Sequence, residues 1–230
     1  RLPEEAVPAA GPGIQDRGSA RIARRPPRGA ALTLRGVLLL LLAATLASAC
    51  TSRGFVMSRA ADALSSSSGG DAFARDDDPE LVREATPFAL KTMESLLAGQ
   101  PRHKGLLGSL AKGFTQYAAA FVLQDALEEE DPSVRAEGID RARRLLLRAK
   151  GYGLRGLSVD HDGFDSRLSA DPVRTAALAG PEEISLLYWT AAAWSLAVAL
   201  SPDDPAMLAD LPRCEALMRR ALAHDEGFDA

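Results

Sequence analysis

The sequence predicts an all-α protein made of antiparallel helix pairs. Between residues 104 and 127, apolar residues recur at steps of three and four, which is the stripe of a long helix. The Asp-Pro-Glu at 78–80 is a helix start, because aspartate caps free amides and proline suits the first helical position. No segment alternates with the period of a strand. The short connections favour antiparallel neighbours, so we expect a compact solenoid or bundle that resembles tetratricopeptide repeats.

Residues 1–49 are predicted to be a disordered leader followed by a signal peptide. Five arginines between positions 21 and 35 precede an apolar run that ends on small residues and Cys50. The run is too short to span a membrane. Cys50 stands where bacterial lipoproteins carry their acylated cysteine, although Ala47 replaces the more usual leucine. We therefore predict lipid attachment at Cys50; the alternative is an ordinary cleavage site with a chance cysteine.

Charge excludes one class of partner. Residues 1–49 hold seven arginines and three acids, so the chain's net charge of −4 leaves −8 from Cys50 onward. An acidic domain does not attract nucleic acid. Basic pairs such as Arg143-Arg144 are expected to be solvated helix faces.

The part after Cys50 divides into a tether and a domain. Residues 50–77 contain a run of serine and glycine and then an acidic run, which are typical of a flexible tether. Residues 78–230 form the predicted helical domain. Its first helix ends near Gly99 and is kinked or divided by Pro87. The residues expected to face inward from this helix are Leu81, Ala85, Phe88, Met93, Leu96 and Leu97.

Five more helical segments follow the one over 104–127. Asp131-Pro132-Ser133 precedes a helix through Tyr152, and a connection over 160–172 leads to a short helical turn. Residues 184–200 are apolar on nearly every side, which predicts a central, buried helix. A short helix and an amphipathic one ending near His224 complete the chain. In the last helix the expected core residues are Cys214, Leu217, Ala221 and Leu222.

Two motifs suggest chemistry that their context does not support. The glycines of 151–156 match a dinucleotide fingerprint but lie in a helical pattern and not after a strand, so we expect close helix packing or a kink. Asp160-His161-Asp162 could hold a cation or act in acid-base catalysis, but two adjacent acids are not a cage, and a solvated loop is expected. No metal site, cofactor or catalytic residue is predicted, and the protein is not expected to be an enzyme.

Five aromatic residues are candidates for a ligand-binding wall. Both tryptophans lie on the predicted central helix. They could line an apolar channel, or they could be plain core, as aromatic residues on such a helix usually are. The candidates are Tyr117, Phe121, Tyr188, Trp189 and Trp194.

Several stretches together resemble the T-component of TRAP (tripartite ATP-independent periplasmic) transporters. They are residues 78–85, 87–97, 114–122, 141–149, 188–194, 210–212 and 220–222. The resemblance implies a periplasmic lipoprotein associated with the solute-binding subunit, able to form a homotrimer, with a channel that holds or passes an apolar ligand. Members usually continue with further helices, so the domain is expected to be truncated at Ala230.

Two other functions stay open at this point. Helical solenoids serve many partners, so the protein could be a general envelope scaffold unrelated to transport. An enzyme working through His161 is the third hypothesis. For location we expect a lipid anchor on the periplasmic side of the envelope, with the outer membrane favoured because no aspartate follows Cys50.

Overall fold

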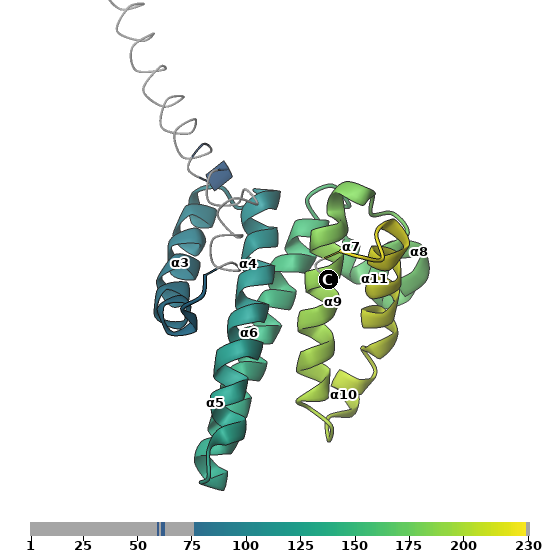
Figure 1. Cartoon of the computed structure of the whole chain (residues 1–230). Coiled ribbons are helices and arrows are strands. Elements are labelled where there is room, and N and C mark those ends of the chain that lie inside the picture. Colours follow the sequence, from purple (N-terminus) through teal and green to yellow (C-terminus); the bar gives the residue numbers. More distant parts are fainter. Residues whose placement is uncertain (1–58, 60, 63–75, 229–230) are drawn as a thin grey trace, which may run out of the picture. The chain divides into compact units, whose positions relative to one another are not determined.

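The computed structural model describes residues 59, 61–62 and 76–228, and every regular element of this part is a helix (Figure 1). The predicted all-α class is confirmed, since no strand occurs in the described residues. The predicted signal peptide and Cys50 lie outside them. The elements are α3 (Pro79–Gly99), α4 (Lys104–Tyr117), the π-helical turn η1 (Ala118–Val122), α5 (Leu123–Glu128), α6 (Pro132–Leu157), α7 (Phe164–Ala170), α8 (Pro172–Ala176), the 3-10 turn η2 (Pro181–Glu183), α9 (Ile184–Ala199), α10 (Pro205–Leu208) and α11 (Leu211–His224).

Four helices begin with the same motif, an aspartate followed by a proline. In each, the aspartate side chain accepts a hydrogen bond from one or two amides of the first turn, and proline occupies a position whose N–H would have no partner. The four capping residues are Asp78, Asp131, Asp171 and Asp204. These local signals explain why the helix starts can be read from the sequence.

The helix predicted over residues 104–127 is continuous but irregular. α4 passes through η1 into α5 without a break, and α6 then returns beside it (Figure 1). The π-helical turn accommodates extra backbone and rotates the stripe that faces the neighbouring helices. Phe114 is buried before the turn, Ala118 and Val122 are buried within it, and Ala126 is buried after it.

α3 is one helix that contains Pro87, and its inward face differs from the prediction. Leu90 and Leu97 are its buried residues. Leu81 is 54% exposed and Phe88 is 78% exposed, so the expectation that both face inward was wrong. α3 packs mainly against α4, and a helix at the edge of the fold buries only a narrow stripe.

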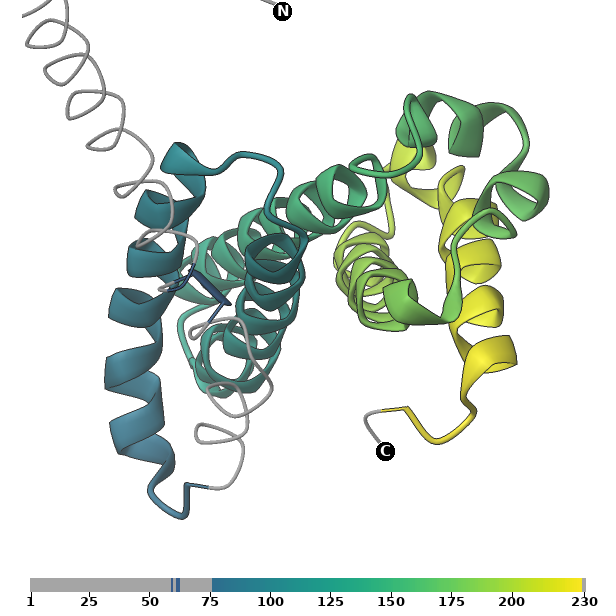
Figure 2. The same ribbon diagram turned by 90° about the horizontal axis from the view of Figure 1, so that it is seen from above.

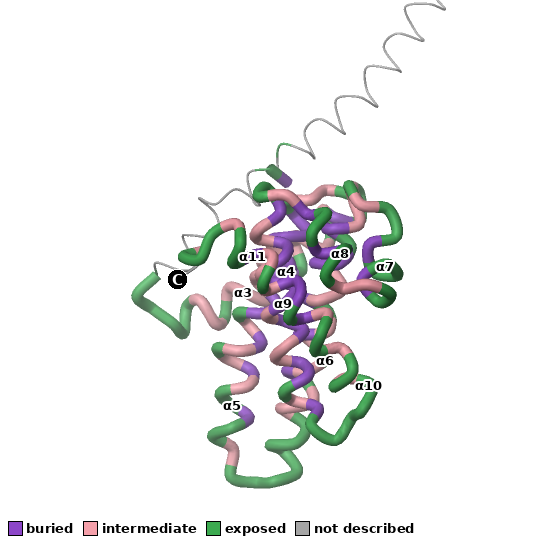
Figure 3. Tube along the Cα trace, turned by 90° about the vertical axis from the view of Figure 1, so that its right-hand side faces the viewer, coloured by how far each residue is buried: buried purple, intermediate pink, exposed green. Residues whose placement is uncertain are grey.

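α9 is the central helix, as its all-round apolar sequence predicts. It packs against α4, α6 and α11, and Figure 2 shows it between α6 and α11. Residues buried along it include Leu187, Ala193 and Trp194, each fully enclosed. The burial pattern in Figure 3 follows from this arrangement, with buried positions gathered on α4 and α9 and exposed ones on the outer turns.

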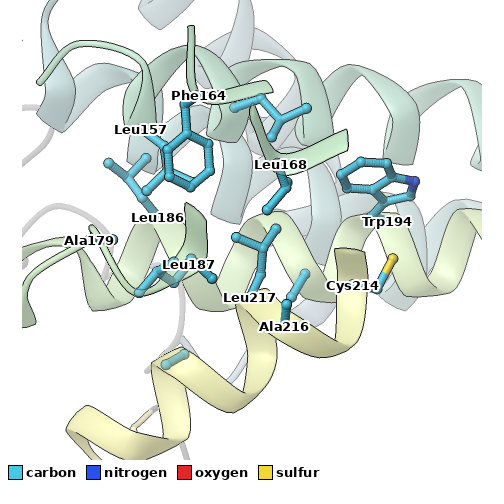
Figure 4. Close-up of a cluster of buried hydrophobic side chains, with 14 of the residues drawn as sticks. Leu157, Phe164, Leu168, Ala179, Leu186, Leu187, Trp194, Cys214, Ala216 and Leu217 are labelled. Atoms are coloured by element: carbon cyan, nitrogen blue, oxygen red, sulfur yellow. The ribbon is translucent and has the colours of Figure 1, made fainter. Parts of the chain in front are cut away.

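Two hydrophobic clusters meet at α9. One joins residues of α7, α9 and α11 with the end of α6 (Figure 4). The other joins α3 and α4 with α6 and includes Ala193 of α9. In α11, Cys214, Leu217 and Ala221 are buried as predicted, but Leu222 is 41% exposed because it lies just past the buried stripe.

A short piece of the predicted tether contacts the domain. Ala61 is fully buried in the cluster of α3 and α4, and the carboxylate of Asp62 lies 3.1 Å from Nε2 of His103. His103 also caps α4 through a bond from the amide of Leu106. None of the described helices has the length and apolar character needed to cross a membrane.

Candidate functional site

The five predicted ligand-wall residues lie in three separate places. Tyr117 and Phe121 are neighbours where α4 meets η1, with ring centroids 5.9 Å apart. Both are half-buried, and the guanidinium of Arg83 on α3 lies 4.9 Å from the Phe121 ring. This pair therefore has one aromatic face near the surface and a cation over it.

Tyr188 and Trp189 form a second group on α9. Their ring centroids are 5.1 Å apart, and the ring of Phe228 lies 5.4 Å from Tyr188 on its other side. The ammonium of Lys112 on α4 lies 5.3 Å from the centre of Trp189. We call Tyr188, Trp189 and Phe228 the α9 aromatic cluster. Sequence reasoning missed Phe228, because no helical spacing links it to α9.

Trp194 has the surroundings of a core residue. It is fully buried, and its Nε1 donates to Asp210 over 2.9 Å (Figure 4 shows its place in the cluster). Asp210 also accepts from Arg213, and the ammonium of Lys150 lies 3.6 Å from the Trp194 ring. Burial lowers the pKa of Lys150, although the charge of Asp210 opposes that shift. A ligand-wall role for Trp194 stays a prediction.

A shallow surface depression lies on α6, and none of the five aromatic residues lines it. Its walls are Val134, Glu137, Gly138, Asp140, Arg141 and Arg144. Four of its six lining residues are charged and the depression is open, which does not suit an apolar ligand.

The loop that contains Asp160, His161 and Asp162 is partly tied into the fold. Glu183, with a side chain only 2% exposed, lies 2.8 Å from Nε2 of His161 and 3.0 Å from the ammonium of Lys104. Lys104 also donates to Asp160 over 2.5 Å. These four residues, which we call the Glu183 network, join α4, the α6–α7 connection and η2. The expected solvated loop describes Asp160 and Asp162, which are exposed, but not His161.

The hydrogen bonds of this network keep Glu183 ionised. Burial alone would raise the pKa of Glu183, but bonds from His161, Lys104 and the amide of Gly180 outweigh it, so its pKa lies below the usual value. The pKa of Lys104 is raised, because its bonds to Asp160 and Glu183 exceed the effect of its own burial. The described residues gather no set of three or more metal-ligating side chains. The Glu183 network is therefore a set of ion pairs and hydrogen bonds that links three segments of the fold.

The glycines with dinucleotide-like spacing lie within α6 and serve packing. A Cβ on Gly153 would stand 1.8 Å from Oγ1 of Thr190, and one on Gly156 would stand 2.4 Å from Leu186. Two of the three glycines therefore let α6 approach α9 closely, as expected, while Gly151 has open space around it. Cys214 also has the environment of a core residue, since burial raises its pKa to about 11 and leaves it unreactive.

A comparison with protein families decides the identity. The family model for the TRAP transporter T-component matches residues 75–230, which include every helix from α3 to α11. The chain belongs to this family. The resemblance noted in the sequence is thereby confirmed.

The chain is also similar to a curated bacterial protein. An uncharacterized protein of Treponema pallidum (strain Nichols) is 30% identical over 155 residues, which cover 65% of this chain and 48% of that protein. The chain thus spans about half the length of this relative.

Proposed function

We propose that this T-component is a non-enzymatic adaptor on the periplasmic side of the bacterial cell envelope. In this role it docks the solute-binding subunit of a TRAP transporter. The observation that carries the proposal is the family match over all helices from α3 to α11. Helices paired like tetratricopeptide repeats and held by a buried α9 offer a rigid surface for a partner. A homotrimer is part of the proposal, and the outer membrane is the favoured location.

Co-purification tests the docking step directly. The lipidated protein is retained on a support and offered the TRAP solute-binding subunit from the same bacterium, with an unrelated periplasmic binding protein as the control. We expect selective retention of the first. Equal retention of both, or of neither, would favour a general envelope scaffold over a transport adaptor.

We further propose that the α9 aromatic cluster contacts an apolar ligand. Tyr188 and Phe228 are half-buried, and Trp189 is 9% exposed, so a ligand can reach these rings with a small adjustment. The pair Tyr117 and Phe121 is the second candidate. Trp189→Phe should remove most of the tryptophan fluorescence change caused by an apolar ligand, while Trp194→Phe should preserve it. Extraction of the protein from native envelopes and mass spectrometry would identify such a ligand.

The proposed anchor is the acylated Cys50. Two or more acyl chains hold a protein firmly at a membrane, whereas one is marginal. Cys50→Ala should therefore release the domain from the membrane fraction without changing its helical circular dichroism. A variant that stays in the membrane fraction would contradict the anchor.

A further inference from the structure

α6 concentrates positive charge in an acidic protein. It contains seven basic and two acidic residues, whereas the whole chain has a net charge of −4. The sequence shows these residues only as scattered pairs. The helix brings a subset of them to one face.

Four arginines form that face, at steps of three, four and seven along the helix. Such steps place side chains on one side, over about 21 Å of helix length. All four are exposed, and Figure 3 shows exposed positions recurring along α6. The side chain of Arg144 is 63% exposed and that of Arg148 is 45% exposed. We call them the arginine row: Arg141, Arg144, Arg148 and Arg155.

The row is only partly neutralised inside the domain. Arg144 pairs with Asp140, and Arg148 pairs with Glu94 of α3. The Arg144–Asp140 pair is exposed and therefore weak, whereas Glu94 is only 10% exposed and holds Arg148 more firmly. Each of the two arginines still has guanidinium donors left over. Arg141 forms no ion pair within the described part of the chain, and Arg155 donates only to the carbonyl of Pro101, over 3.3 Å.

The surroundings of the row do not suit a small anion or an ordinary protein interface. The shallow depression beside Arg141 and Arg144 also contains the carboxylates of Glu137 and Asp140, which repel a phosphate held there. A protein interface has an apolar centre, often aromatic. Between the arginines of the row, the aromatic Tyr152 is half-buried and donates its hydroxyl to Glu94. An exposed line of cations without an enclosed pocket fits an extended anionic surface.

The position of the chain's N-terminal side indicates which surface that is. Ala61 and Asp62 are fixed beside His103, in the same connection as Pro101, the partner of Arg155. Ten residues lie between Cys50 and Ala61, so eleven Cα–Cα steps give a reach of about 36–40 Å at most. A lipid on Cys50 therefore keeps this end of the domain, and the row that starts there, close to the bilayer.

We propose that the arginine row docks on the anionic phospholipid headgroups of the membrane that holds the Cys50 lipid. The choice of lipid over protein rests on the proposed anchor. Each arginine at an anionic surface contributes about a fivefold change in the ratio of docked to undocked domain. The row thus sets how the tethered domain lies on the membrane.

Fluorescence quenching at the membrane surface tests the proposal on the lipidated protein. A probe is attached at Glu137→Cys on α6 or, as a control site, at Glu215→Cys on α11; the buried Cys214 does not compete for the label. The protein is placed in vesicles of phosphatidylcholine alone or with about one third phosphatidylglycerol, each with spin-labelled headgroups. We expect stronger quenching at position 137 in the anionic vesicles, reversal by high salt, and little change at position 215.

Matched charge variants identify the residues responsible. Arg141→Gln with Arg144→Gln should weaken docking by about 25-fold, from two fivefold steps. Arg174→Gln with Arg219→Gln removes the same charge from α8 and α11, where both side chains are exposed, and should leave quenching unchanged.

The possible outcomes distinguish a failure of docking by the arginine row from a failure of the Cys50 anchor. Docking by the row is overturned if quenching at position 137 is the same with and without phosphatidylglycerol. It is also overturned if quenching falls equally in both double variants. If the probe at position 137 changes its fluorescence only after a solute-binding subunit is added, the row is a protein interface, and docking on lipid is also overturned. A failed anchor is seen separately, as protein that does not stay with the phosphatidylcholine vesicles.

Discussion

Among the described residues, Glu183 is the one carboxylate that is buried. Its charge is acceptable there because His161, Lys104 and the amide of Gly180 all donate to it. Removal of this carboxylate leaves the three donors without an acceptor and Lys104 without a buried charge partner. Glu183→Ala should therefore lower the free energy of unfolding by about 2–3 kcal/mol.

The same carboxylate predicts a dependence of stability on pH. The pKa of Glu183 is lower in the folded protein than its ordinary value of 4.5, so the folded state binds this proton less readily. Its contribution is complete above the ordinary pKa and is lost as the pH falls through the folded pKa. Urea unfolding at pH values from neutral to below the ordinary pKa should show a smaller loss of stability for Glu183→Gln than for the native protein. The exposed Glu182→Gln is the control and should keep the native slope; an identical slope in both variants would count against the network.

Gly153 and Gly151 lie in the same turn of α6 and should respond in opposite ways to alanine. A methyl group at Gly153 would overlap the buried Thr190, so Gly153→Ala should destabilise the fold by about 1–3 kcal/mol. Gly151 has nothing within 4 Å, and alanine is the better helix former, so Gly151→Ala should stabilise it by up to about 1 kcal/mol. Thermal unfolding of the two variants measures the difference. Equal effects would mean that α6 and α9 are not in close contact at this point.

At the scale of helices, the sequence predicts what depends on local chemistry. The aspartate caps and the apolar stripes predict the starts of α3, α6 and α10 and the central position of α9. The π-helical turn and the exposure of Phe88 depend on which neighbours each helix meets, and no local pattern records this. The candidate site shows the same division. His161 and Glu183 are 22 residues apart and meet only in the fold, as do Phe228 and Tyr188.

The revised orientation of α3 can be tested with two residues of one helix turn. Leu90 is 2% exposed and packs beside Gly113, so Leu90→Ala should cost about 2–4 kcal/mol. Phe88 is mostly exposed, and Phe88→Ala should change stability by less than about 0.5 kcal/mol. Chemical denaturation of both variants gives the two values. A large loss for Phe88→Ala would restore the face predicted from the sequence.

At the scale of the whole molecule, charge and packing are distributed differently. The chain as a whole has a net negative charge, while α6 carries a basic face. Packing has a single centre, because α9 takes part in both main hydrophobic clusters. The rigidity of the outer helices therefore depends on one buried helix.

That dependence predicts that the two clusters unfold together. Both tryptophans lie on α9, so fluorescence reports the centre, whereas far-ultraviolet circular dichroism reports all the helices. For a two-state unit the two urea transitions should coincide. Leu107→Ala in the α3–α4 cluster and Leu187→Ala in the α9–α11 cluster remove fully buried side chains. Each should lower stability by about 2–5 kcal/mol and move both transitions equally. If Leu107→Ala moved the circular dichroism transition and left the fluorescence transition in place, α3 and α4 would be a separate unit, and α9 would not be the common centre.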